Sequence, residues 1–76
     1  MAGTLSNWTF RDVRTFLLSR GFESHHIKGS HYYFKKYHNT RIYMTHVQHH
    51  GSKSIPIGTV HAIIQQSGIP KGEWTS

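Results

Sequence analysis

The residues best suited to chemistry are Gly29-Ser30-His31, which precede the aromatic and basic run 32–37. Histidine moves protons readily near neutral pH, because its ordinary pKa is about 6.5. Lysines, arginines and aromatic rings surround this histidine along the chain, and together they suit a polyanion whose bases can stack. We therefore take His31 as the candidate catalytic residue; the alternative is an exposed or strand-capping histidine without a function.

The size and charge of the chain limit what this site can be. A chain of 76 residues predicts a single domain, 1–76, with an active site that is shallow or completed by its partner. The formal net charge is +6, from nine Lys and Arg against three Asp and Glu, with eight histidines counted as neutral. Such a surface attracts a nucleic acid, an acidic protein or an anionic membrane.

The residue types also exclude several classes of site. The chain has no cysteine, so disulfides, thiolate catalysis and cysteine-type zinc sites are excluded. Neighbours in a strand point to opposite faces, which makes His25-His26 and His49-His50 poor pairs of metal ligands. We assign no metal and no cofactor. No leader and no apolar run that could span a bilayer is evident, which predicts a cytoplasmic protein without a membrane partner.

Hydrophobic periodicity and turn residues predict the elements that position His31. Thr9 and Asp12 have the spacing of a capping box, and Gly21 suits the end of the same helix. Thr59 is expected to cap the second helix. The predicted elements are a helix over Phe10–Arg20, strands over Phe22–Ile27, His31–Tyr37 and Arg41–Val47, and a second helix carrying Val60, Ile63 and Ile64 and closed by Gly68.

This order of elements predicts an α+β fold, α-β-β-β-α, with a three-stranded antiparallel sheet. Both helices are expected on one face of the sheet, leaving the other face open. Residues 1–7 form a loose start, and 69–74 adds a short final turn with Trp74 folded over the core. His46 shares a strand face with Ile42 and Met44, so we expect it to be a partly buried core histidine.

At this point several motifs resemble one family. Gly29-Ser30-His31 before an aromatic strand resembles the signature of the HicA toxins, the messenger-RNA interferases of bacterial toxin–antitoxin modules. Residues 16–22 resemble the end of that family's first helix, and His50-Gly51-Ser52-Lys53 resembles its His-Gly-Gly-Lys loop. Residues 57–69 resemble its second helix with a Gly-Thr start. The resemblance covers roughly residues 9–74.

The resemblance implies a fold like that of double-stranded-RNA-binding domains. It also implies a metal-independent ribonuclease whose essential histidine maps to His31, and a HicB antitoxin that blocks the active face. Three positions depart from the family pattern: Tyr32 stands where a second histidine is common, Ser52 replaces a glycine, and Gln48 replaces a frequent proline. The first departure means that the sequence offers no second proton-transfer group directly after His31.

Metal-free RNA cleavage needs a base, an acid and positive charge on the phosphate. Lys28 lies in the turn before the strand of His31 and, like Lys35 and Lys53, is expected to hold a phosphate. His50 is the best second histidine, because its loop returns toward the hairpin. Ser30 is a turn residue rather than a nucleophile. The full set assigned to RNA binding is Lys28, Ser30, Lys35, Lys36, Arg41, His50 and Lys53.

Three functions account for these features. The first is a HicA-like endoribonuclease toxin, monomeric when free, that cleaves messenger RNA and is neutralised by a HicB-like antitoxin. The second is a non-catalytic RNA-binding module of the same fold, and the third is a basic adaptor that docks an acidic protein. For each tyrosine of the strands, packing against the sheet or core is the alternative to contact with RNA bases.

Overall fold

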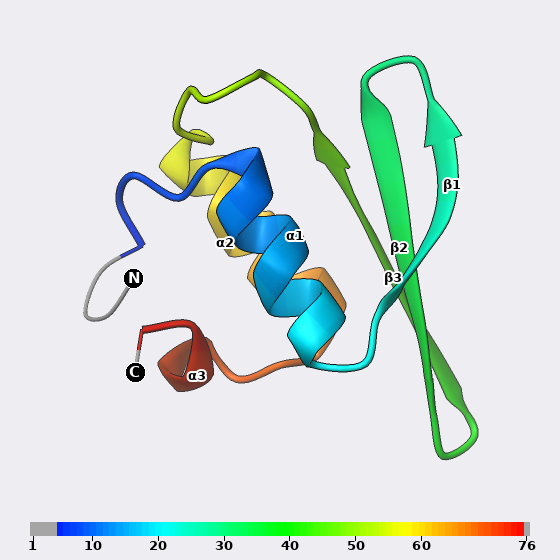
Figure 1. Ribbon diagram of the computed structural model, residues 1–76. Helices are drawn as coiled ribbons and strands as arrows, with labels where there is room; N and C mark the ends of the chain where they lie inside the picture. Colours follow the sequence, from blue (N-terminus) through cyan, green and yellow to red (C-terminus); the bar gives the residue numbers. More distant parts are fainter. Residues whose placement is uncertain (1–4, 76) are drawn as a thin grey trace.

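The computed structural model describes residues 5–75 and has the predicted order of elements (Figure 1). The strands form one antiparallel sheet in the order β1-β2-β3, which confirms the α+β prediction. A short third helix follows the second. The elements are α1 (Phe10–Ser19), β1 (Glu23–Lys28), β2 (His31–His38), β3 (Arg41–Gln48), α2 (Ile57–Ser67) and α3 (Lys71–Thr75).

All three helices lie on one side of the sheet, and the other side is uncovered (Figure 1). Helix α1 begins at the predicted capping box. The Thr9 hydroxyl accepts the Asp12 N–H at 3.2 Å, and the Asp12 carboxylate accepts the Thr9 N–H at 2.9 Å. The helix buries Phe10, Val13 and Leu17, the apolar stripe that its periodicity predicted.

Helix α2 begins earlier than expected, and the predicted Thr59 cap is wrong. The Pro56 carbonyl accepts the N–H groups of Thr59 and Val60 at 3.0 and 3.1 Å, so Pro56 is the N-cap residue and Thr59 lies inside the first turn. The proline ring presets the backbone angle for this entry, and no side chain caps the helix. The far end is as predicted, with Gly68 in the left-handed conformation at φ +73°.

Two tight turns fix the register of the sheet. Gly29-Ser30 joins β1 to β2 with Gly29 at φ +61°, and Asn39-Thr40 joins β2 to β3 with Asn39 at φ +55°. Lys28 is therefore the last residue of β1 rather than part of the turn. The β2–β3 hairpin has an unbroken register from His31 opposite Gln48 to His38 opposite Arg41.

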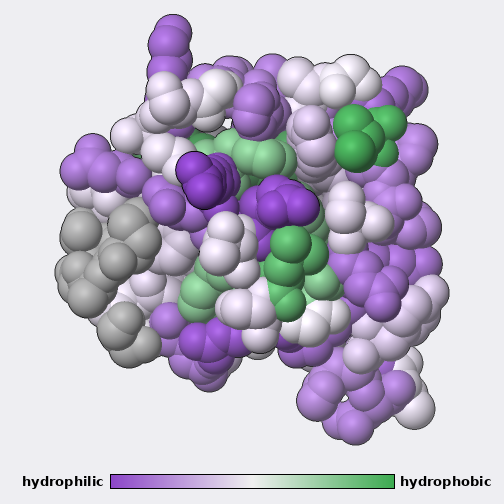
Figure 2. All heavy atoms as spheres, viewed as in Figure 1, coloured by the Kyte–Doolittle hydropathy of each residue, from purple (hydrophilic) through white to green (hydrophobic). Residues whose placement is uncertain are grey.

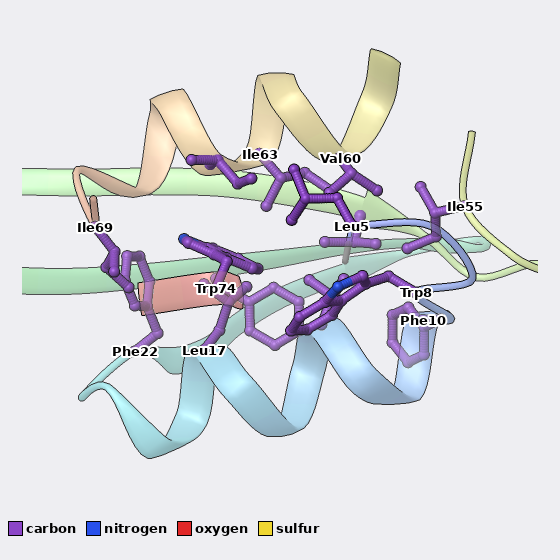
Figure 3. Close-up of a cluster of buried hydrophobic side chains, with 14 residues drawn as sticks. Leu5, Trp8, Phe10, Leu17, Phe22, Ile55, Val60, Ile63, Ile69 and Trp74 are labelled. Carbon is purple, nitrogen blue, oxygen red and sulfur yellow. The ribbon is translucent and has the colours of Figure 1, made fainter. Parts of the chain in front are cut away.

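The core lies between the helices and the sheet (Figure 3). Trp74 of α3 is only 2% exposed and packs on the rings of Phe16 and Trp8, with centroid distances of 4.2 and 5.4 Å. This confirms the predicted fold-back of Trp74. In the segment expected to be loose, Leu5 is buried in the core because it supplies apolar surface beside these rings, while residues 1–4 lie outside the described residues.

Candidate active site

His31 belongs to the uncovered face of the sheet. Side chains alternate between faces along β2, and Phe34 is 1% exposed in the core while Tyr32 contacts the ring of Phe10 at 4.7 Å. The odd-numbered residues of β2 therefore point to the opposite face, away from the helices. On β2 these open-face residues are His31, Tyr33, Lys35 and Tyr37.

The backbone holds His31 at the first position of β2, where it lies opposite Lys28 of β1 and Gln48 of β3. Its side chain is half-buried. The carbonyl of Ser30, in the preceding turn, accepts the N–H of His49 at 2.7 Å. This bond ties the turn before His31 to the loop after β3, so Ser30 acts through its backbone as a turn residue.

A second histidine lies against His31. The ring centroids of His31 and His46 are 5.4 Å apart, with 38° between the planes. His46 in turn stacks on Tyr33, its partner across β2 and β3, at 5.1 Å and 21°. His26 of β1 contacts the other side of the same row, 5.6 Å from Tyr33. We call His26, His31, Tyr33 and His46 the open-face ring cluster.

The prediction that His46 is a core histidine is wrong. Thr45 and Val47 occupy the core side of β3, with 2% and 1% exposure, so His46 must point outward. Its companions Ile42 and Met44 are 58% and 45% exposed on the same open face. Their apolar character suggested burial. Thr45, however, lies opposite the buried Phe34, so Thr45 faces the core and its neighbours Met44 and His46 face outward.

The predicted cations are divided between the two faces. Lys28 and Lys35 share the face of His31, and the Lys35 ammonium lies 4.9 Å from the centre of the Tyr37 ring. Lys36 points to the helix side, 5.8 Å from the Phe22 ring, and Arg41 lies on the same side. The structure thus brings Lys28 and Lys35, but not Lys36 or Arg41, to the face of His31.

The loop after β3 starts beside His31, because Gln48 is its partner in the sheet. His49 packs its ring on Phe10 and Tyr32 at 4.4 and 5.8 Å, toward the helix side. His50 and Lys53 are exposed in this loop and are joined by a turn, in which the Lys53 N–H bonds the His50 carbonyl at 3.4 Å. The histidine whose ring contacts His31 is therefore His46 rather than His50.

The tyrosines follow the alternation expected of a sheet with one buried face. Tyr32 and Tyr43 pack against the core, whereas Tyr33 and Tyr37 lie on the open face. Tyr32, the departure from the family pattern, therefore points away from His31. A histidine at position 32 would share this orientation and would also point away from His31.

Acidic groups contribute little to the open face. Asp12 belongs to the capping box, and Glu73 is ion-paired with Arg20. Glu23 lies opposite Lys35 in the sheet. Within residues 5–75, no group of three histidine, cysteine, aspartate or glutamate side chains is placed to hold a metal ion. The chemistry that this face offers is proton transfer by imidazole, beside lysine ammonium groups.

A shallow hollow of about 260 Å³ borders the ring cluster. The sheet lines it with Tyr33, Met44, Thr45 and His46, and α2 lines it with Gln66, whose side chain is hydrogen-bonded to that of Thr45 at 2.7 Å. Seen from the side drawn in Figure 1, the surface is mostly hydrophilic, with hydrophobic residues in small separate areas (Figure 2). None of the helices in the described part of the chain is long and apolar enough to cross a bilayer.

Comparison with models of known protein families finds a match. The family model described as the HicA toxin of bacterial toxin–antitoxin matches residues 10–69, which include α1, the whole sheet and α2. Both His31 and His46 lie within the matched segment. No curated protein and no solved structure matches the chain.

Proposed function

The chain belongs to the HicA toxin family of bacterial toxin–antitoxin systems, and from this we propose that it is a metal-independent endoribonuclease that cleaves messenger RNA. The observation that carries the proposal is the position of His31. Its imidazole is half-buried at the end of an uncovered sheet face, directly opposite the cation Lys28. An acid–base group beside an ammonium supplies a proton-transfer group and the positive charge, two of the functions that phosphodiester cleavage without a metal needs.

The cleavage step uses the RNA itself as the nucleophile. A base removes the proton of the 2′-OH, and the 2′-oxygen then forms a bond to phosphorus. The bond from phosphorus to the 5′-oxygen breaks, and an acid returns a proton to that oxygen. The products are a 2′,3′-cyclic phosphate and a 5′-hydroxyl end. DNA, which lacks the 2′-OH, is not a substrate for this step.

Charge and shape support RNA as the substrate. The net charge of +6 favours a polyanion through counterion release. Tyr37, which is 66% exposed, presents its ring on the face of His31, where it can stack on an unpaired base. The shallow face suits a flexible single strand that lies across it. The protein acts in the cytoplasm, where messenger RNA is found.

The same proposal includes the partner. A toxin of this kind is neutralised by a cognate antitoxin, and a HicB-like protein that covers the open face would block His31. Exposed apolar residues extend that face beyond the histidines: Tyr37 is 66%, Ile42 58% and Met44 45% exposed. Surface of this kind suits a protein partner. The free toxin is a monomer in this proposal.

The direct test compares the wild type with His31→Ala, using His38→Ala as the matched control. His38 lies on the same strand but is exposed at its far end, beside the β2–β3 turn. We expect His31→Ala to lose about 10²–10⁴-fold in RNA cleavage and to stop arresting growth, while His38→Ala keeps both activities. Wild-type cleavage by His31→Ala would contradict the proposal. RNA retained at full length by the wild type would favour the non-catalytic RNA-binding module.

A further inference from the structure

We propose that His46 is a second catalytic residue of this chain, and that His31 and His46 act as the base–acid pair on one phosphodiester. This inference rests on the proposed ribonuclease activity and deepens it. The sequence alone gave His46 a place in the core, and the resemblance of the motifs to the HicA family pointed to His31 rather than to His46. The case for His46 comes from its geometry.

The first argument is distance. The two imidazoles lie on neighbouring strands and on the same uncovered face, with ring centroids 5.4 Å apart. At this separation a phosphate between the rings can reach a nitrogen on each within the about 2.6–3.2 Å that general acid–base catalysis requires. One ring can therefore take the proton of the 2′-OH next to this phosphate, while the other gives a proton to its 5′-oxygen.

The second argument is orientation. His46 is exposed, so an unsupported ring would sample several rotamers. Stacking on Tyr33 at 5.1 Å, with 21° between the planes, limits the ring to one plane beside His31. The core does not need this side chain, because Thr45 and Val47 fill the buried side of β3. The orientation of the His46 ring thus matters for the open face and not for the packing of the core.

The third argument is the charge around the pair. The charged side chains that share this face are Lys28, opposite His31, and Lys35 with its cross-strand partner Glu23. Lys28 can hold the phosphate, but histidine is the side chain whose charge changes near neutral pH. His26 is the remaining imidazole of the ring cluster, and it contacts Tyr33 rather than His31. Among the described residues, His46 is thus the imidazole placed to share a phosphate with His31.

The proton balance of the reaction fits two histidines. One neutral imidazole takes the 2′-OH proton as the bond from the 2′-oxygen to phosphorus forms. One protonated imidazole gives its proton to the 5′-oxygen as the bond from phosphorus to that oxygen breaks. After the step the two rings have exchanged protonation states. Exchange of protons with water resets them for the next cleavage.

The test uses three phenylalanine variants, each of which keeps a ring and removes the ionisable nitrogens. They are His31→Phe, His46→Phe and the matched control His26→Phe, which changes the ring on the other side of Tyr33. The substrates are an oligoribonucleotide and the same oligomer with sulfur in place of the 5′-bridging oxygen at one position. A thiolate leaves without a proton, so this substrate does not need the acid.

We expect His31→Phe and His46→Phe each to lose about 10²–10⁴-fold on normal RNA, while His26→Phe cleaves at the wild-type rate. The sulfur substrate should restore one of the two impaired variants, which identifies its histidine as the acid. Thermal unfolding and RNA retention equal to those of the wild type show that folding and stacking are intact.

Two results would overturn the assignment of His46. One is a wild-type rate for His46→Phe, which makes the ring a stacking platform only. The other is a failure of the sulfur substrate to restore either variant. Both leave the proposed ribonuclease in place as long as His31→Phe is inactive. If His31→Phe also cleaves normally, the proposed role of His31 fails with it.

Discussion

Gly68 lies so close to the ring of Tyr43 that a β-carbon on the glycine would fall 2.4 Å from Cε1 of the tyrosine. The glycine ends α2 in the left-handed conformation, at φ +73°, and the tyrosine stands on the helix side of β3. The missing side chain therefore does two things. It permits the backbone turn, and it lets the end of α2 pack directly on the sheet that carries the open face.

Replacing Gly68 with alanine should destabilise the fold more than the same change at Gly51. Gly51 has φ +64°, and nothing lies within 4 Å of the place that a β-carbon would take. Gly51→Ala therefore measures only the cost of a left-handed backbone at a residue other than glycine, about 1–2 kcal/mol in the free energy of unfolding. Gly68→Ala adds the displacement of the Tyr43 ring. The free energies of unfolding from urea titrations provide the comparison. Equal losses would show that Tyr43 moves aside without cost.

A second stability prediction concerns the hydrogen bond from Thr45 to Gln66. The Thr45 hydroxyl is buried and donates to the Gln66 side-chain oxygen at 2.7 Å, whereas Gln66 itself is exposed. Thr45→Val removes the donor, and the exposed Gln66 side chain then bonds to water, so we expect the free energy of unfolding to fall by about 0.5–1.5 kcal/mol. Gln66→Leu strands a buried hydroxyl, a loss of about 1–3 kcal/mol.

The measurement is the urea midpoint of each variant under identical conditions. The order of the two losses is the prediction, with Gln66→Leu the less stable protein. The reverse order would mean that the buried hydroxyl finds another acceptor, and that the packing of the threonine methyl matters more than its hydrogen bond.

The sequence predicted those parts of the fold that short-range physics decides. Thr9 and Asp12 are three residues apart and form the capping box within one turn of helix. Asn39 takes the positive φ that its turn requires, and Gly68 ends α2 where its conformational freedom is needed. Each of these features depends on neighbours along the chain, which the sequence displays directly.

The face of β3 could not be predicted in the same way. Ile42 and Met44 look like core residues and Thr45 does not, yet the first two are exposed and Thr45 is buried. The pairing of Thr45 with Phe34 on the neighbouring strand decides which side of β3 faces the core. A usable signal was present, because the two-residue turn at Asn39-Thr40 implies that His46 lies opposite Tyr33, on the face of His31.

A third prediction tests how far the small core depends on α3. Trp74 is 2% exposed and contacts the rings of Phe16 and Trp8. Trp74→Ala should lose about 3–5 kcal/mol, which is a large share of the stability of a domain this small. Leu18→Ala is the control, since Leu18 is 36% exposed on α1. Circular dichroism at rising temperature should show early unfolding of Trp74→Ala alone, and a wild-type midpoint would contradict the role of α3.

The last prediction separates two adjacent lysines by the face they occupy. Lys35 lies on the open face with His31, whereas Lys36 points to the helix side and lies over the Phe22 ring. If single-stranded RNA crosses the open face, Lys35→Ala removes a phosphate contact and Lys36→Ala does not. Each lost contact lowers the salt dependence of binding by about 0.7 in the slope of log K against log salt.

The binding measurement uses His31→Ala as the background, so that the RNA stays intact during titration. Lys28→Ala, which removes the cation opposite His31, should lower the slope as Lys35→Ala does. Lys36→Ala should keep the parent slope even though it removes the same charge from the chain. Equal slopes for the Lys35 and Lys36 variants would mean that RNA responds to net charge rather than to the open face.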